Sequence, residues 1–127
     1  MAVAAADKPG LSVIIPALNE AACLDATLSC LQPMRKRGHE VIVVDGGSYD
    51  ATVQLAERSA ERVIHSRRGR ARQMNAGAQE AAGDILWFLH ADTRAPEHAD
   101  QLILTALASG EHQWGRFDVE LAAGGPL

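Results

Sequence analysis

Four groups of polar residues each come directly after a short apolar run, and their side chains could together bind a phosphorylated ligand and a metal ion. Carboxylate and imidazole groups can hold a divalent cation, and Arg68, Arg70 and Arg72 offer forked cationic donors that suit a diphosphate. Glycines lack a Cβ and let the backbone come close to a ligand. The four groups are Asn19 with Glu20, Asp45 with the Gly-Gly-Ser that follows it, Arg68 with Arg70, and His90 with Asp92.

The apolar runs that precede these groups are predicted to be buried strands. The first, second and fourth are continuous and apolar, whereas the third is only a short strand with two β-branched residues at its centre. Unbroken runs of this kind are typical of strands that are buried on both faces of a parallel sheet. The predicted strands cover residues 11–17, 40–45, 62–66 and 85–89.

Helices are predicted between the strands, because the intervening segments carry apolar residues at helical spacing and end signals. In the first of them three leucines share one face, Asn19 is the expected N-cap and Pro33 the expected end. Ser48 or Asp50 is expected to cap the second helix, and Gly83 to close the third. The predicted helices cover residues 20–31, 48–59, 70–82 and 96–109, and a fifth strand is predicted over 113–121.

This alternation predicts an α/β fold, with a doubly wound, mostly parallel sheet that carries helices on both faces. Ligands of such sheets bind outside the carboxyl ends of the strands. Since all four polar groups follow strands, we expect them to meet at one edge of the sheet. The domain is expected to span residues 11–121, between a flexible N-terminal lead (1–10) and a tail (122–127).

The composition narrows the class of protein. The chain has 127 residues, enough for one domain with a core, and its net charge of -4 argues against a nucleic-acid binder that neutralises phosphates generally. No apolar stretch approaches the roughly 20 residues of a membrane span, and no secretory signal is present, so a cytoplasmic location is expected. Cys23 and Cys30 are two helical turns apart, too far for a disulfide.

Each polar group also has an ordinary structural interpretation. The Gly-Gly-Ser after Asp45 could be only a turn with a helix cap, and the arginines of 67–72 could form a solvated loop. His90 could be a hydrogen-bonded histidine at a strand end, and the other histidines show no metal-ligand spacing. The large aromatic residues Trp87, Phe88 and Trp114 are expected in the core rather than as a platform for stacking a base.

Taken in order, these segments resemble family 2 glycosyltransferases of the GT-A fold. Four motifs carry the resemblance, and the last of them lies where the family has its DxD metal motif. Together they cover residues from about 11 to 93, which is most of the chain. The four motifs are residues 12–20 (SVIIPALNE), 43–52 (VVDGGSYDAT), 69–77 (GRARQMNAG) and 89–93 (LHADT).

The resemblance implies a nucleotide-sugar donor, UDP-linked, and a divalent metal, Mn²⁺ or Mg²⁺. The metal would act as a Lewis acid that stabilises the UDP leaving group. His90 stands at the first acidic position of the motif, and imidazole is acceptable to Mn²⁺. By position, Pro16, Ala17, Glu20 and Asp45 would line the base and ribose, with Gly47 letting the backbone come close. Arg70 and Asn75 would lie near the nucleotide or phosphates, and Asp92 with His90, on either side of Ala91, would hold the metal.

Domains of this family normally continue well beyond the matched segments, into the acceptor site and, in inverting members, a catalytic carboxylate. The chain therefore resembles the donor-binding half of a glycosyltransferase, apparently truncated, with the base expected beyond the chain end. Asp118 and Glu120 fall before that region and are not expected to be the base. An incomplete sheet edge of this kind invites self-association into a homo-oligomer.

We therefore predict a glycosyltransferase that moves a sugar from a nucleotide-diphosphate donor to a glycan, lipid or small-molecule acceptor. The alternative is a non-catalytic module that binds the nucleotide sugar. A nucleotidyltransferase ranks below both, because no glycine-rich basic loop follows the first strand directly. A dinucleotide-binding Rossmann domain ranks last, because that position also lacks a G-x-G-x-x-G motif.

Overall fold

A sheet of four parallel strands organises the computed structural model, which describes residues 9–118. Its strands are β1 (Leu11–Ala17), β2 (Glu40–Asp45), β3 (Arg62–His65) and β4 (Ile85–Phe88), in the spatial order β3-β2-β1-β4. β1 pairs in parallel with both β2 and β4. After β3 at one edge, the chain crosses to β4 at the other, so the prediction of a doubly wound α/β sheet is confirmed.

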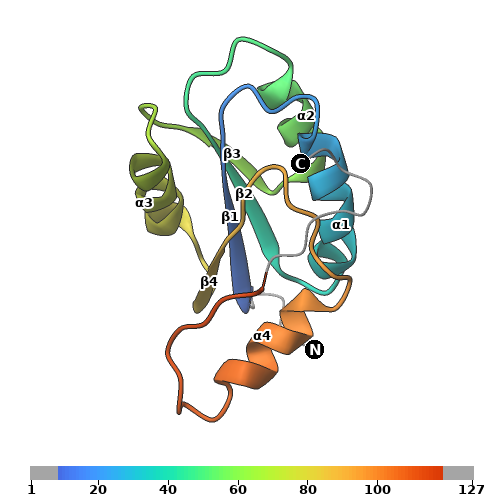
Figure 1. The fold of residues 1–127 in the computed structure, drawn as a ribbon, viewed down its shortest axis with the longest axis vertical. Helices are drawn as coiled ribbons and strands as arrows, with labels where there is room; N and C mark the ends of the chain where they lie inside the picture. The colour runs from blue at the N-terminus through green and yellow to red at the C-terminus, as the bar shows by residue number, and fades with distance from the viewer. Residues whose placement is uncertain (1–8, 119–127) are drawn as a thin grey trace, which may run out of the picture.

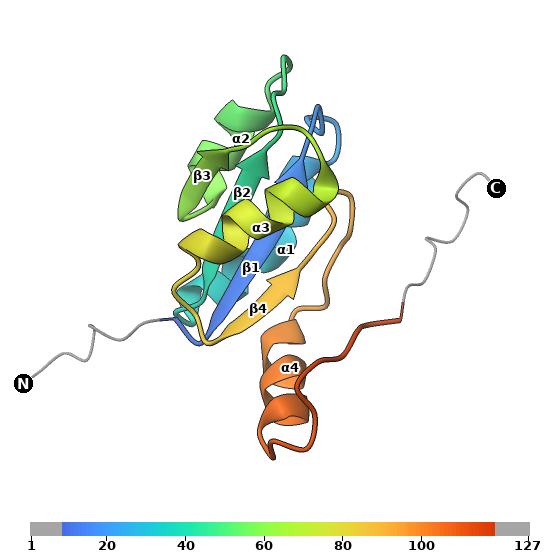
Figure 2. The ribbon, with the colours of Figure 1, turned by 90° about the vertical axis from the view of Figure 1, so that its left-hand side faces the viewer.

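Helices cover both faces of this sheet (Figure 1). α1 (Leu24–Lys36) and α2 (Thr52–Ser59) lie on one face, and α3 (Arg70–Glu80) lies on the other, where it crosses in front of the strands in Figure 2. Alternate residues of β1 and β2 point to opposite faces and so divide the core in two. Leu11, Val13 and Ile15 join the large cluster under α1, whereas Ile14, Ile42 and Val44 lie under α3.

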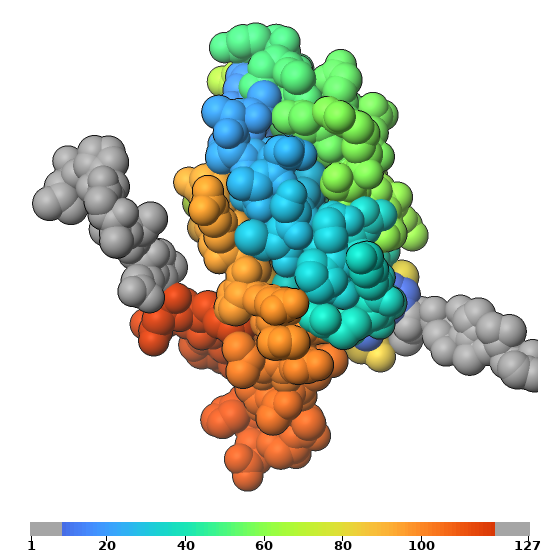
Figure 3. Space-filling model, turned by 90° about the vertical axis from the view of Figure 1, so that its right-hand side faces the viewer, coloured from blue at the N-terminus to red at the C-terminus, as the bar shows by residue number. Residues whose placement is uncertain are grey.

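α4 (Ala99–Leu107) extends from the end of the molecule below α1, as the space-filling view in Figure 3 shows. Its first turn is fixed by the buried carboxylate of Asp100, which accepts hydrogen bonds from Arg37 at 2.8 and 2.9 Å and lies 3.1 Å from His39 Nε2. These Arg37 hydrogen bonds are the largest cause of a lowered Asp100 pKa, which burial opposes. None of the helices within residues 9–118 is long and apolar enough to cross a membrane.

Gly77 lets α3 lie close on the sheet. A Cβ at this position would stand 2.5 Å from Cγ2 of Ile14 and 3.0 Å from Cγ2 of Val44. Both partners are fully buried, so neither can move aside at low cost.

Gly77→Ala is therefore expected to lower the free energy of unfolding by about 1–3 kcal/mol, although alanine is the better helix former. Urea unfolding followed by circular dichroism measures the change. Gly115→Ala, whose Cβ would meet nothing within 4 Å, is the control and should cost little. A stabilised Gly77→Ala protein would contradict the close packing of α3.

The first helix differs from the prediction at both ends. It begins at Leu24 rather than at 20, because the backbone N–H groups of residues 19–21 bond to side chains of the loop after β2 and of Thr52 at the start of α2. Asn19 is not its N-cap but adopts a positive φ of 53°. Pro33 lies inside the helix, which runs on to Lys36 and thereby buries Met34 on the same face as Leu31.

Other helix and strand ends differ as well. α3 ends at Glu80 with Ala81 at its C-cap, so Gly83 is not the cap. Gly83 instead passes close to β1, where a Cβ would lie 2.7 Å from Ser12 Oγ. The predicted fifth strand is wrong for residues 113–118, which form no regular structure, and its remainder lies outside the described residues together with 1–8 and the tail 122–127.

The last strand is not buried on both faces, as the sequence predicted. β4 is an edge strand, and α3 packs on β1 and β2 instead, which leaves Leu86 39% and Phe88 44% exposed. Trp114 is 81% exposed, so the prediction of a core position is wrong for Phe88 and Trp114. Trp87 is half-buried, and its ring lies 5.5 Å from that of Phe117.

Candidate functional site

A pocket of about 290 Å³ lies at the carboxyl edge of the sheet. Its walls come from the end of β1 with the loop that follows it, from the loop after β4 and from the first turn of α3, three segments that are far apart in the sequence. The structure brings together here six of the ten residues that the resemblance places at the donor and metal site. They are Pro16, Glu20, Arg70, His90, Ala91 and Asp92.

The loop after β1 is held in place by the loop after β2. The N–H of Asn19 donates to Ser48 Oγ at 2.8 Å, and its side-chain oxygen accepts the N–H of Tyr49 at 2.9 Å. The N–H of Glu20 donates to Thr52 Oγ1, also at 2.8 Å. These bonds join two loops about 30 residues apart in the sequence and fix the backbone of Glu20 at the pocket wall.

Asp45 shapes the second loop and does not line the pocket. Its carboxylate is buried and accepts the N–H groups of Gly47 and Ser48, each at 3.0 Å, while His65 Nδ1 lies 3.6 Å away. Burial pushes the pKa of Asp45 upward, but the hydrogen bonds from Ser48 and Gly47 and the nearby His65 outweigh it, so the net pKa is lowered. Gly47 has a φ of 107°, which favours glycine.

Asp45→Asn is expected to lower the free energy of unfolding by about 2 kcal/mol at neutral pH, because hydrogen bonds to a charged acceptor are lost. Since the folded pKa lies below that of the unfolded chain, the carboxylate stabilises the fold above the unfolded value, near 3.9. This contribution is lost as the pH falls through the folded value. Urea unfolding at several pH values should therefore show the two proteins converging in acid, with exposed Asp118→Asn as the control. A pH-independent difference would contradict the role of the charge.

Gln73 ties the two central strands to the start of α3, and sequence reasoning gave it no role. Its buried side-chain amide donates to the carbonyl of Ala17 at 3.0 Å and to that of Val44 at 2.9 Å. Its side-chain oxygen accepts the N–H of Gly69 at 3.2 Å. Gln73 therefore sets where Arg70, the next residue after Gly69, enters the pocket. Ala17 contributes through this carbonyl rather than by lining the pocket, and its side chain is buried.

Thr27 was also missed, although it is one of the buried residues of α1. Its hydroxyl donates to the carbonyl of Ala91 at 2.6 Å. This bond ties the loop after β4 to α1 and places Ala91 between His90 and Asp92 at the pocket wall. A threonine at a core position of an apolar helix face is a sequence signal for such a bond, because a buried hydroxyl requires a partner.

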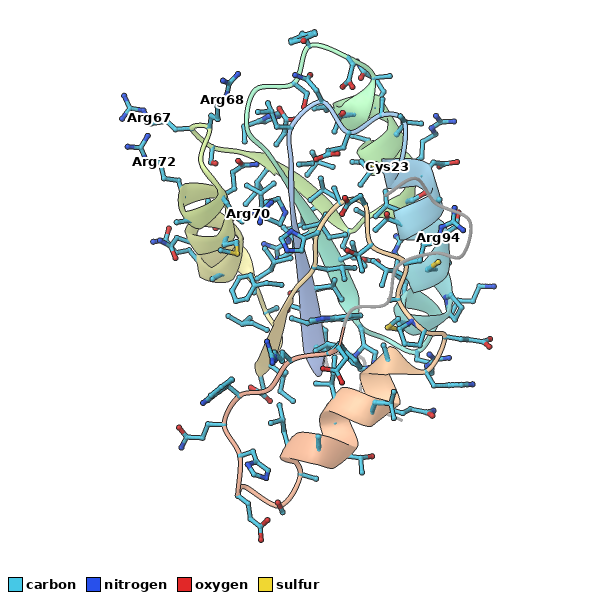
Figure 4. All side chains as sticks on the ribbon, in the orientation of Figure 1. Cys23, Arg67, Arg68, Arg70, Arg72 and Arg94 are labelled. Atoms are coloured by element: carbon cyan, nitrogen blue, oxygen red, sulfur yellow. The ribbon has the colours of Figure 1, made fainter. Side chains whose placement is uncertain are left out.

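The arginines of residues 67–72, in the loop after β3 and the first turn of α3, do not all point into the pocket. Arg70 points towards the middle of the molecule and lines the pocket, whereas Arg67, Arg68 and Arg72 point outward (Figure 4). The predicted set of three diphosphate donors, Arg68, Arg70 and Arg72, is therefore reduced to Arg70 at the pocket wall. Asn75 is exposed on α3 and does not line the pocket.

His90 and Asp92 fit a metal that is shared with a substrate. Both side chains are exposed at the pocket wall, and neither forms a hydrogen bond or ion pair with another residue of the described range 9–118. No group of three or more His, Cys, Asp or Glu residues in that range could enclose a metal. Mg²⁺ typically binds through one or two carboxylates together with substrate phosphates, so this donor set suits a cation held jointly with a diphosphate.

Cys23 lies beside the pocket, and its thiol is not prepared for nucleophilic chemistry. Burial, hydrogen bonding to Glu20 and the negative charges of Glu20 and Asp92 all raise the pKa of this thiol. A thiol with a raised pKa stays protonated and is a weak nucleophile. Cys23 and Cys30 are both free, as predicted.

Fold and pocket together define an α/β domain with a polar pocket at the carboxyl edge of its parallel sheet. The model of the family described as "Glycosyl transferase family 2" matches residues 12–120. The chain belongs to this family. The resemblance seen in the four motifs is thereby confirmed.

Curated relatives carry the same assignment. The chain is 40% identical over 112 residues to a "PGL/p-HBAD biosynthesis glycosyltransferase" of Mycobacterium tuberculosis, a match that covers 83% of this chain and 43% of the relative. It is 38% identical over 95 residues to "Glycosyltransferase AglE" of Haloferax volcanii, covering 66% of this chain and 31% of the relative. The chain thus spans less than half the length of these relatives.

Solved structures share the fold. Glucosyl-3-phosphoglycerate synthase from Mycobacterium tuberculosis, in complex with Mn²⁺, UDP and glucosyl-3-phosphoglycerate, superposes with a TM-score of 0.70 at 27% identity. That match covers 84% of this chain and 42% of the synthase chain. The structure of S. aureus TarS with UDP-GlcNAc matches with a TM-score of 0.68 at 23% identity, over 78% of this chain and 31% of TarS, which supports the fold alone.

Proposed function

We propose that this chain forms the donor-binding part of a glycosyltransferase that transfers a sugar from a nucleotide diphosphate, with UDP as the nucleotide. The observation that carries the proposal is the pocket at the carboxyl edge of the sheet, which joins one arginine to an imidazole and two carboxylates. The complex of the related synthase with UDP and Mn²⁺ supports the choice of donor and of metal.

The residues divide the donor between them. Pro16 and Glu20 border the space for base and ribose, Ala17 supports it through the carbonyl that Gln73 holds, and Asp45 with Gly47 fixes the loop beside it. Arg70 provides a forked cationic donor for a phosphate, and the first turn of α3 adds a favourable dipole for an anion. Asn75 faces solvent on the same helix, so we propose that it meets only a part of the donor that extends beyond the pocket.

The side chains of His90 and Asp92 would hold a divalent cation against the diphosphate. When bound, such a cation supplies charge stabilisation for the leaving nucleotide. The backbone of Ala91, held by Thr27, keeps the two side chains at a fixed separation in the wall of the pocket. We propose a glycan, a lipid or a small molecule as the acceptor.

Release of free UDP from a set of UDP-sugars, with Mn²⁺ present, tests this proposal. We expect UDP to be released with one sugar in preference to the others, slowly with water alone and faster once an acceptor is present. UDP binding without release from any UDP-sugar would favour a non-catalytic binding module. Preference for a purine nucleotide would contradict the choice of donor.

A further inference from the structure

We propose that an arginine face, formed by Arg67, Arg68 and Arg72, docks this protein on the surface of an anionic phospholipid membrane. All three side chains are exposed, and Figure 4 shows them extending outward at one corner of the molecule. Among the residues that the structure describes, no carboxylate forms an ion pair with any of the three guanidinium groups, and no group accepts a hydrogen bond from them.

Other arginines of the chain do form ion pairs with carboxylates. Arg35 lies 2.8 Å from a carboxylate oxygen of Glu61, and Arg37 lies 2.8 Å from one of Asp100. Acidic residues outnumber basic ones by 16 to 12, so potential partners are plentiful. Three unpaired cations within six residues of an acidic chain give a local positive field, which attracts an anionic partner to this corner of the protein.

The shape of the arginine face favours a surface over a small anion. A free phosphate is held by donors that converge in a concave site. The pocket described above takes in Arg70 and leaves out the three arginines of the face, which extend away from it. Cations spread over an outer corner can each meet a different headgroup of a membrane, where every one adds to the attraction.

Tyr49 adds an interfacial side chain on the same end of the sheet. It is 87% exposed and belongs to the loop after β2, next to the loop that carries Arg67 and Arg68. The two loops leave the sheet from neighbouring positions, because Asp45 and His65 are register partners at the ends of β2 and β3. Tyrosine is enriched at membrane–water interfaces, where its ring lies at the level of the headgroups.

Docking through this face would bring the carboxyl edge of the sheet, and with it the pocket, close to the membrane. A sugar acceptor carried on a lipid could then reach the pocket without leaving the bilayer. This consequence rests on the proposed transfer activity, whereas the docking itself does not.

Co-sedimentation of the full chain with vesicles tests the docking. We expect binding to vesicles that contain phosphatidylserine in phosphatidylcholine, and no binding to phosphatidylcholine alone. Each arginine should contribute about a fivefold change, so the variant Arg67→Gln, Arg68→Gln, Arg72→Gln should bind about a hundredfold more weakly. Tyr49→Ser should weaken binding severalfold without changing the charge.

A second triple variant controls for net charge. Lys36→Gln, Arg58→Gln and Arg116→Gln remove three exposed cations that lie elsewhere, and this variant should bind within about threefold of the unmodified chain. Equal losses in the two triple variants, or no binding by the unmodified chain, would overturn the proposal. If inorganic phosphate abolishes vesicle binding at matched ionic strength, the arginines form a site for small anions instead. If the chain binds duplex DNA more tightly than vesicles, they form a nucleic-acid surface. Either result would overturn it.

Titration of UDP into the arginine-face variant separates this proposal from the proposed function. Because none of the three arginines lines the pocket, UDP binding should be unchanged, which also shows that the variant is folded. Loss of UDP binding in this variant alone would place the arginines in the donor site and overturn the proposal. If the unmodified chain binds vesicles and not UDP, the docking stands and the donor assignment fails.

Discussion

Replacing Asp92 by alanine is expected to weaken UDP binding about a hundredfold in the presence of Mn²⁺ and to leave binding in EDTA unchanged. Asp92 is the one carboxylate in the loop after β4 that reaches the pocket, and it has no ion pair or hydrogen bond within residues 9–118 that its loss would disturb. The variant should therefore fold as the unmodified chain does. Calorimetric titration of UDP under both conditions measures the effect.

Two further variants make this result interpretable. Glu57→Ala removes one exposed carboxylate from α2, away from the pocket, and should bind UDP normally in Mn²⁺. His90→Ala should give a smaller loss than Asp92→Ala, because a neutral imidazole contributes no charge to a hard cation. Equal UDP affinity of the Asp92→Ala and unmodified proteins in Mn²⁺ would refute the metal role of Asp92.

Gln73→Ala is expected to lower the free energy of unfolding by about 3 kcal/mol and also to weaken UDP binding. The substitution removes three hydrogen bonds and leaves the carbonyls of Ala17 and Val44 without this partner. It also frees the start of α3, so Arg70 is no longer held at the pocket wall. Urea unfolding and UDP titration of the same preparation give the two numbers.

Gln79→Ala is the matched control, because Gln79 is exposed on the same helix and should tolerate the change. A double-mutant cycle with Gly46 sharpens the test. A Cβ at Gly46 would lie 2.8 Å from Oε1 of Gln73, so Gly46→Ala should be costly in the unmodified chain and much less so beside Gln73→Ala. If the two substitutions change the free energy of unfolding additively, the side-chain amide of Gln73 does not pack against Gly46 as described.

The strands and the position of the pocket could be predicted from sequence because both follow from local patterns. Continuous apolar runs identified β1 and β2 residue for residue, and the chain direction then determined which edge carries the polar groups. Pro16, Arg70 and Asp92 could be expected to meet since each lies at or next to the carboxyl edge.

Features that depend on distant residues could not be predicted in this way. The start of α1 is set by bonds from the loop after β2, which outweigh the capping preference of Asn19. The exposure of Phe88 depends on which element covers the outer face of β4. Gln73 sits in a helix segment of low hydrophobicity, and only the tertiary fold shows that its amide is buried.

The motif around Asp45 was recognised in the sequence, but the structural role of its carboxylate was not. The sequence places this carboxylate at the end of a strand, where a ligand could reach it. In the structure both oxygens accept hydrogen bonds from the loop that the residue itself precedes, and the side chain is buried. Its contribution to a donor site is therefore expected through the shape of that loop.

We expect the pocket at the carboxyl edge of the sheet to bind uridine diphosphate together with a divalent metal. Calorimetric titration of UDP into the unmodified chain, first with Mn²⁺ and then with EDTA, tests it most directly. We expect saturable binding of UDP at one site in Mn²⁺ and binding at least tenfold weaker in EDTA. Equal binding in both conditions would contradict the role of the metal, and no binding in either would contradict the assignment of the pocket to a nucleotide donor.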